Sequence, residues 1–228
     1  AKACGFQNIN LDLMYGLPGQ EPASWSRSVE EGLALPVTHL SLYQLTVEPE
    51  TVLEKLLEKK ALSLPPEDDV LKMDEITKKM LTNAGFERYE ISNYAKSGFT
   101  CRHNINYWNN LEYVALGAAA VSFLGGWRER RVAEPTEYIN RIARGDSVLG
   151  ERECLSPESS FRETVIMGLR MTRGVSRETI FKRYGFTLEN YYGSALSRLI
   201  DEKLIELTAT HLRITEKGFP FSNMIYCD

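Results

Sequence analysis

The sequence has few cysteines and no long apolar run. Its four cysteines are scattered through 228 residues with no Cys-x-x-Cys pair: Cys4, Cys101, Cys154 and Cys227. This spacing argues against a zinc site and against a dense disulfide framework, and it favours a reducing, cytoplasmic setting. No apolar stretch approaches the roughly 20 residues of a membrane helix, so we expect no integral membrane segment.

An excess of positive charge is also missing. The chain carries 27 basic and 31 acidic residues, which gives a net charge of -4. Because a dedicated nucleic-acid binder usually has a basic face, we expect no nucleic-acid partner. The start has no apolar leader typical of a signal peptide. It also has no initiator Met, which fits either a processed chain or a piece of a longer protein, and the pattern of the first half, described next, favours a piece.

The first half alternates strand-like and helix-like segments. Residues 8–15 and 39–45 have the two-residue period of strands, and we expect a third strand over 86–92. Helices are expected between them, over 22–35, 51–60 and 67–84. This rhythm predicts parallel strands joined by crossover helices. Three such strands do not close a barrel, so this half is typical of the end of a larger α/β barrel or sheet.

The second half changes character. We expect a long loop over 93–108, a buried strand over 115–123 and a helix over 134–145. From about residue 147, three helices and a short hairpin follow, a pattern typical of a winged helix. Eleven basic and eleven acidic residues balance from Glu151 onward, and phosphate binding needs a positive face. A DNA-binding regulator is therefore the minority alternative to a packing or lid role.

Asp12 is the first residue with a pattern that suggests chemistry. It lies in the first expected strand, just before Gly16-Leu17-Pro18-Gly19. Binding sites gather at the carboxyl ends of parallel strands, where a carboxylate can accept hydrogen bonds from a ribose hydroxyl pair or an amine. On pattern alone, a solvated or ion-paired Asp12 is the favoured interpretation.

The second candidate is the segment His103-Asn104-Ile105-Asn106-Tyr107-Trp108. A neutral imidazole is a good iron ligand, Tyr107 and Trp108 offer flat apolar faces suited to a porphyrin, and Arg102 could pair with a propionate. The alternative, favoured from these residues alone, is a structural loop in which His103 bonds to backbone. The charged run from Trp127 to Arg131 is best explained as a solvated turn.

Five motifs occur in an order that resembles a known family: N-I-N-L-D-L-M-Y-G-L-P-G-Q, H-L-S-L-Y-Q-L-T-V-E-P, Y-E-I-S-N-Y-A, C-R-H-N-I-N-Y-W and L-R-I-T-E-K-G. With them the chain resembles the later part of the radical S-adenosylmethionine (SAM) proteins of the oxygen-independent coproporphyrinogen III oxidase family. The H-N-x-x-Y-W element points to its haem-chaperone branch, HemW. The resemblance implies the C-terminal portion of a partial (β/α)6, TIM-like barrel over residues 1–146. A small winged-helix-like α+β domain is implied over residues 147–228.

The same resemblance implies a function and cofactors. In the oxidase, two propionate side chains are oxidatively decarboxylated to vinyl groups; in the chaperone branch, the protein binds haem and delivers it to target proteins. We therefore expect a portion of a haem-binding chaperone, with haem or porphyrin and haem-accepting proteins as partners, and a true oxidase as the alternative. A [4Fe–4S] cluster and S-adenosylmethionine are implied for the full-length family. An open sheet edge predicts association between copies.

Residue roles are likewise implied by the resemblance. Asp12, Thr46 and Val121 match positions that contact or flank S-adenosylmethionine. His103, Tyr107 and Trp108 match the proposed haem-binding element, with His103 as the ligand of the haem iron. Two departures matter. The cluster motif Cys-x-x-x-Cys-x-x-Cys is absent, so this chain alone should hold no cluster and make no radical. Residues 115–122 read A-L-G-A-A-A-V-S where many members read G-x-G-A-G-A-H-S.

Overall fold

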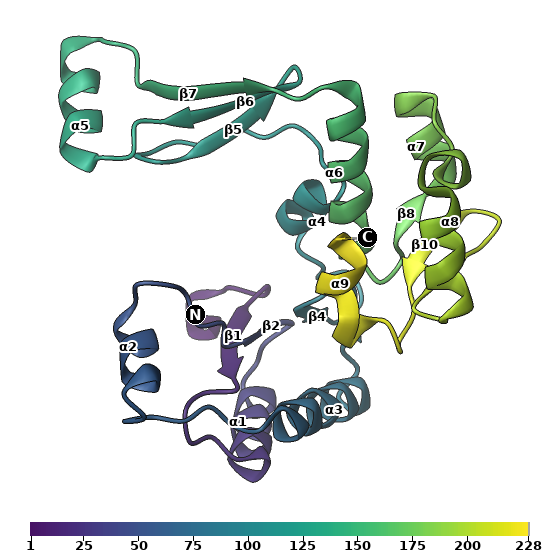
Figure 1. Cartoon of the computed structure of the whole chain (residues 1–228). Helices are drawn as coiled ribbons and strands as arrows, with labels where there is room; N and C mark the ends of the chain where they lie inside the picture. The colour runs from purple at the N-terminus through teal and green to yellow at the C-terminus, as the bar shows by residue number, and fades with distance from the viewer. Residues whose placement is uncertain (228) are drawn as a thin grey trace. The chain divides into compact units, whose positions relative to one another are not determined.

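The chain divides into two compact units between Thr100 and Cys101 in a computed structural model, which describes residues 1–227 (Figure 1). Helices and strands are mixed in both units. No helix among the described residues is long and apolar enough to cross a membrane.

A parallel strand pair and its crossover helix open the first unit, after a short 3-10 turn at Lys2–Cys4. Strand β1 (Asn10–Tyr15) pairs in parallel with β2 (His39–Gln44), as the alternating sequence predicted. Helix α1 (Pro22–Ala34) connects them. It begins at a proline, which lacks only an N–H that the first helical turn leaves unpaired in any case.

The apolar face of this sheet packs on α1 and on α3 (Glu67–Asn83), while α2 (Val52–Glu58) carries no buried residue. Trp25 of α1 is 1% exposed, and its indole N–H donates to the backbone oxygen of Met73 at 3.1 Å and to the Thr77 hydroxyl at 2.8 Å. The core also contains Val29, Val37, Leu40, Leu42, Leu81, Phe86 and Tyr94.

The expected third strand over 86–92 is wrong. It is replaced by two short strands, β3 (Glu87–Arg88) and β4 (Asn93–Ala95), and β4 runs antiparallel to both β2 and β3. The sheet order is β1-β2-β4-β3. The chain reverses between β3 and β4 because local hydrogen bonds close a turn: Arg88 donates to the carbonyl oxygens of residues 90 and 91, and Glu90 accepts from the Ser92 amide at 3.1 Å. Only β1 and β2 therefore keep the parallel arrangement.

The second unit begins with a helix where a loop was expected. Residues 93–108 contain β4 and helix α4 (Arg102–Trp108), so the predicted long loop is wrong. A three-stranded antiparallel sheet follows, in the order β5 (Val121–Leu124), β6 (Trp127–Arg131), β7 (Leu149–Cys154). Helix α5 (Pro135–Arg144) connects β6 to β7. Of the strand expected over 115–123, only the residues from Val121 onward are in a strand, β5.

The rest of this unit has the predicted three helices and hairpin. The helices are α6 (Pro157–Leu169), α7 (Arg177–Tyr184) and α8 (Leu188–Asp201). Ser156, Ser176 and Thr187 cap their N-termini by accepting backbone N–H groups. Strands β8 (Val175–Ser176), β9 (Ile205–Leu207) and β10 (His211–Ile214) form a sheet in the order β8-β10-β9. A 3-10 turn, Phe219–Phe221, and helix α9 (Ser222–Cys227) end the described chain.

The contacts of the chain divide at residue 100, whereas the sequence placed a boundary between residues 146 and 147. That expected boundary falls between α5 and β7. Because β7 pairs with β6 along most of its length, the sheet continues across residue 147. A division there would separate a strand from its neighbour.

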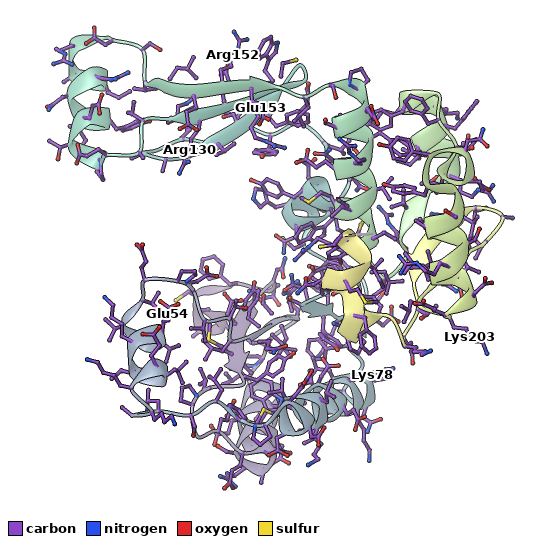
Figure 2. The ribbon with its side chains drawn as sticks, in the orientation of Figure 1. Glu54, Lys78, Arg130, Arg152, Glu153 and Lys203 are labelled. Carbon is purple, nitrogen blue, oxygen red and sulfur yellow. The ribbon has the colours of Figure 1, made fainter. Side chains whose placement is uncertain are left out.

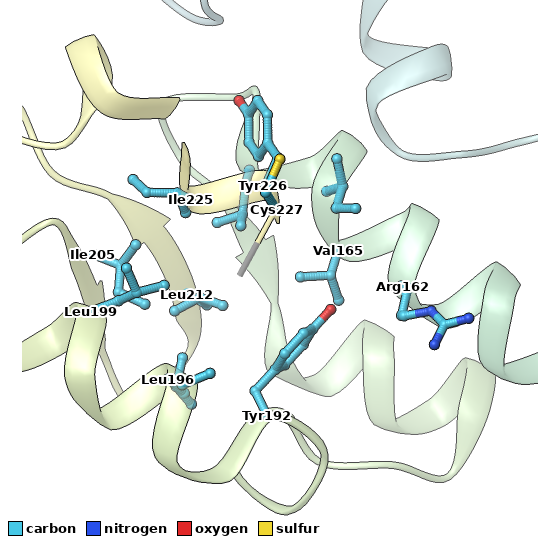
Figure 3. A pocket seen from close by; sticks show the side chains of 13 residues that line it. Arg162, Val165, Tyr192, Leu196, Leu199, Ile205, Leu212, Ile225, Tyr226 and Cys227 are labelled. Carbon is cyan, nitrogen blue, oxygen red and sulfur yellow. The ribbon is translucent and has the colours of Figure 1, made fainter. Parts of the chain in front are cut away.

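An apolar cavity of about 160 Å³ lies in the core of the second unit, among α6, α8, the β9–β10 hairpin and α9 (Figure 3). Its wall includes Val165, Leu196, Leu199, Leu212 and Ile225. Pockets that hold drug-sized ligands usually measure about 300–1,000 Å³, so this space is too small for a tetrapyrrole.

Candidate functional site

His103 lies in the first turn of α4, and its side chain is exposed. Tyr107 follows four residues later, so both side chains share one face of the helix. Their rings meet edge to face with centroids 4.7 Å apart. The row continues from Tyr107 to Tyr113 at 4.4 Å and from Tyr113 to Phe123 of β5 at 6.4 Å. We call these four residues the aromatic row; it leads from a buried phenylalanine to a surface imidazole.

The imidazole at the end of the aromatic row is the most available of the chain's three. Both ring nitrogens of His39 are hydrogen-bonded, and Nδ1 of His211 is paired with the Thr210 hydroxyl at 3.0 Å. Within the part of the chain that the structure describes, neither ring nitrogen of His103 has a hydrogen-bond partner. The backbone bond anticipated in the structural-loop interpretation is thus not formed. A neutral imidazole with an open nitrogen is a good ligand for iron.

Trp108 does not lie beside His103 and Tyr107 on the helix. Its indole ring faces Arg170, whose guanidinium carbon is 4.6 Å from the ring centroid. The indole Nε1 is buried without a hydrogen-bond partner among the described residues. Five positions separate Trp108 from His103, which turns the two side chains to different sides of a helix. The structure therefore brings two of the three predicted residues of the haem element together and uses the third for packing.

Polar contacts and a glycine anchor the end of α4 to α6. The Asn110 amide donates to the Thr164 hydroxyl at 2.9 Å, and Thr164 is also paired with the Tyr184 hydroxyl at 2.6 Å. Gly168 of α6 has no side chain where the backbone oxygen of Trp108 passes. These contacts hold in place the end of α4, the helix that carries His103 and Tyr107 of the aromatic row.

Arg128 joins the sheet to the same helix. Its Nη2 donates to both carboxylate oxygens of Glu163, at 2.7 and 2.8 Å. Arg128 also neighbours Tyr113 of the aromatic row, where burial raises the pKa of the phenol. Tyr113 is therefore neutral near pH 7 and presents an uncharged ring.

Asp12 lies on the polar face of the first unit's sheet, and its side chain is exposed. The Asn10 amide donates to Asp12 Oδ1 at 2.6 Å. The Asn10 oxygen is 2.6 Å from His39 Nδ1, and His39 Nε2 is 2.7 Å from the Tyr89 hydroxyl. Ser41 adds a contact to the Asn10 amide nitrogen at 3.1 Å.

Sequence reasoning found Asp12 but missed the residues linked to it. A signal was present: Asn10 and Asp12 alternate with apolar residues on β1, and His39 and Ser41 do so on β2. In parallel register Asn10 lies opposite His39. Burial lowers the pKa of His39, while the charge of Asp12 acts in the opposite direction.

Thr46 and Val121, the other predicted cofactor contacts, lie in different units. Thr46 is exposed, two residues after β2, and no hydrogen bond joins it to Asp12 in the described chain. Val121 begins β5 and lines a charged groove of about 470 Å³. Arg130, Arg152 and Glu153 line the same groove from β6 and β7 (Figure 2).

The described residues do not fit an iron–sulfur cluster. No group of three or more His, Cys, Asp or Glu side chains in residues 1–227 is placed to hold a metal ion. None of the four cysteines forms a disulfide within residues 1–227, and they lie in separate parts of the chain.

Comparison with known proteins gives consistent matches. The model of the HemN C-terminal domain matches residues 155–221. The chain is 36% identical over 226 residues to "Heme chaperone HemW" of Bacillus subtilis, covering 99% of this chain and 60% of that protein. It is 38% identical over 174 residues to "Heme chaperone HemW" of Synechocystis, covering 75% of this chain and 42% of that protein. The chain thus spans about three fifths, or less, of these relatives.

A solved structure has the same fold. It is described as "Coproporphyrinogen III oxidase (HemN) from Escherichia coli is a Radical SAM enzyme", and it superposes with a TM-score of 0.79 at 18% identity. The match covers 99% of this chain and 55% of that one. At this identity the likeness concerns the fold.

Proposed function

Because this chain belongs to the HemN-related family that includes the heme chaperone HemW, we propose that it is the portion of a haem chaperone that binds haem and releases it to acceptor proteins. The observation that carries this proposal is the exposed imidazole of His103 at the end of the aromatic row. In the same proposal, β1 and β2 with α1 belong to a partial (β/α)6 barrel. The winged-helix-like domain that the sequence places within residues 147–228 is proposed to consist of α6, α7, α8 and the β8-β10-β9 sheet, while β7 stays with the sheet of β5 and β6.

Haem is the cargo in this proposal, and His103 supplies one axial nitrogen to its iron. Tyr107 packs edge to face on the imidazole and limits its rotation, so the ring needs little further ordering when iron binds. Arg102 is exposed beside His103 and is suited to a propionate carboxylate. A ligand on an exposed helix face leaves the cargo open to an acceptor protein, which favours transfer over storage.

Asp12 is proposed to act on a different ligand. Its exposed carboxylate is suited to accept hydrogen bonds from the ribose hydroxyls of S-adenosylmethionine, which supplies the adenosyl group in radical SAM chemistry. Thr46 and Val121 stay predictions for the surroundings of the same cofactor. The cytoplasmic setting also stays a prediction.

A haemin titration followed in the Soret region tests the haem proposal. We expect a saturable red shift for the wild type and its loss in His103→Ala, because the variant removes the only iron-binding nitrogen on α4. His211→Ala is the matched control, since it removes an imidazole of the same unit outside the aromatic row. Cys101→Ser separates the imidazole from the neighbouring thiol.

The results for the variants assign the iron ligand. Retention of the shift in His103→Ala would refute His103 as the ligand, and its loss in Cys101→Ser alone would assign the iron to sulfur. Loss in His103→Ala with retention in both controls supports the proposal.

A further inference from the structure

Four side chains on the polar face of the first unit's sheet form a continuous hydrogen-bonded chain. It runs from Tyr89 through His39 and Asn10 to Asp12, with successive distances of 2.7, 2.6 and 2.6 Å. The four residues come from β1, β2 and the turn after β3. We call them the polar chain.

The chemistry of the last residue fixes the direction of every bond. An ionised carboxylate can only accept, so the amide nitrogen of Asn10 must face Asp12 and its oxygen must face His39. Nδ1 of His39 must therefore carry a proton and donate to that oxygen. In a neutral imidazole the remaining nitrogen is an acceptor, so the Tyr89 hydroxyl donates to Nε2.

Burial makes this arrangement rigid at its inner end. His39 is 4% exposed and Ser41 is 3% exposed, whereas Asn10 and Asp12 are exposed. A hydrogen bond between two exposed side chains alone would exchange freely with water. Because the Asn10 oxygen is also held by the buried imidazole, its amide has one orientation, and Asp12 meets a fixed donor. The buried Ser41 hydroxyl lies within hydrogen-bond distance of both the nitrogen and the oxygen of this amide.

We propose that Tyr89, His39 and Asn10 are positioning residues that hold Oδ1 of Asp12 and leave Oδ2 to accept a hydrogen bond from a vicinal diol, as in the ribose of a nucleoside. Oδ2 has no hydrogen-bond partner within residues 1–227. This inference rests on the proposed role of Asp12 toward S-adenosylmethionine and adds the residues that orient it. If His39 becomes protonated, Nε2 donates to the Tyr89 oxygen and the bonds to Asn10 and Asp12 keep their direction.

The tautomer of His39 tests the polar chain without any ligand. Two-bond ¹H–¹⁵N NMR spectra distinguish an imidazole protonated on Nδ1 from one protonated on Nε2, and His103→Ala and His211→Ala identify the His39 signals. We expect the Nδ1–H form. An Nε2–H form would overturn the proposal, because the Asn10 oxygen would then face the Asp12 carboxylate.

Two substitutions of His39 test the consequence for binding. In His39→Asn the shorter amide can still donate to Asn10 from near the Nδ1 position, whereas the longer amide of His39→Gln places its donor near Nε2. S-adenosylmethionine is the probe, titrated by calorimetry. We expect His39→Gln to weaken binding about 2- to 10-fold, the worth of one ordering hydrogen bond, and His39→Asn to stay near wild type. Thermal unfolding of both variants confirms that they fold.

A failure of the positioning role and a failure of the proposed ligand give different results. Equal affinities for wild type and His39→Gln would overturn the positioning role. A wild-type chain that binds no S-adenosylmethionine would instead refute the proposed ligand of Asp12, and the tautomer measurement would still decide whether the polar chain exists.

Discussion

His39 shows how much one buried side chain depends on its surroundings. It is the only one of the three histidines with both ring nitrogens paired inside the described chain. It joins residues 10 and 89, which lie far apart in the sequence. Burial lowers its pKa in the folded state relative to the usual 6.5. The same group therefore links local geometry to the pH dependence of stability.

We predict that His39 makes the first unit less stable as the pH falls through the range just below 6.5. There the unfolded chain binds a proton that the folded chain does not, so the free energy of unfolding decreases with decreasing pH. Above the unfolded pKa this contribution is constant. Urea unfolding of wild type and His39→Gln between pH 5 and pH 7.5 measures it: the variant should lose this part of the slope. His211→Gln should keep it because His39 remains, and an identical slope in wild type and His39→Gln would contradict the prediction.

Prediction from the sequence found Asp12 at one end of the polar chain and His103 and Tyr107 of the aromatic row, but not the other members of either group. Asp12 and His103 stand out because each lies in a short recognisable motif. His39, Tyr89, Tyr113 and Phe123 do not, because only strand register and the packing of α4 bring them to their partners. Trp108 stays a prediction for the haem element, although its ring faces Arg170 and not His103, because adjacent residues point to different sides of a helix.

At the scale of elements, α4 is the clearest difference between sequence and structure. Its seven residues include two asparagines, a histidine and two aromatics, all of them modest helix formers. The sequence pattern therefore predicted no helix here. Packing against α6 supplies the stabilisation that the weak helix propensities of these residues do not. The long helices α1, α3, α6 and α8 were predictable because each has apolar residues at helical spacing. A proline start supports α1 and α6, acidic residues in the first turn support α3, and a side-chain cap supports α6 and α8.

The glycine at the contact between α6 and β8 gives a test at this scale. A Cβ at Gly168 would lie 2.5 Å from Cγ2 of Val175, whose branched side chain is buried and stiff. We expect Gly168→Ala to destabilise the protein by about 1–3 kcal/mol through overpacking, despite the better helix propensity of alanine.

A double-mutant cycle separates this clash from other effects of the alanine. In the Val175→Ala background the added methyl group has room, so Gly168→Ala should be neutral or stabilising there. The free energies of unfolding come from urea denaturation of the four proteins. Equal costs in both backgrounds would show that the Val175 contact is not the cause.

At the scale of the whole molecule, the distribution of sulfur is decisive for its chemistry. Cys4, Cys154 and Cys227 are exposed and Cys101 is half-buried, and none is part of a metal-binding group among the described residues. An iron–sulfur cluster is held by several cysteine thiolates, which must lie close together. In the sequence the four cysteines are scattered and the motif Cys-x-x-x-Cys-x-x-Cys is absent, so the lack of a cluster stays a prediction.

We expect anaerobic reconstitution of this chain with iron and sulfide to give no cysteine-dependent cluster. The measurement is the absorbance near 400 nm together with the iron and sulfide content after desalting. A variant with all four cysteines replaced by serine is the matched control. A cluster retained by wild type and lost in that variant would contradict this expectation.

The outer position of β1 has a practical consequence. In the order β1-β2-β4-β3, this six-residue strand is paired on one side only among residues 1–227, so a row of its amide and carbonyl groups has no strand partner in the described chain. Relatives of the family contain more residues than this chain matches. A polypeptide matching the remaining residues of such a relative can be produced separately and mixed with this chain. If it supplies a strand along β1, recovered cluster or cofactor binding is the signal that the two polypeptides have assembled.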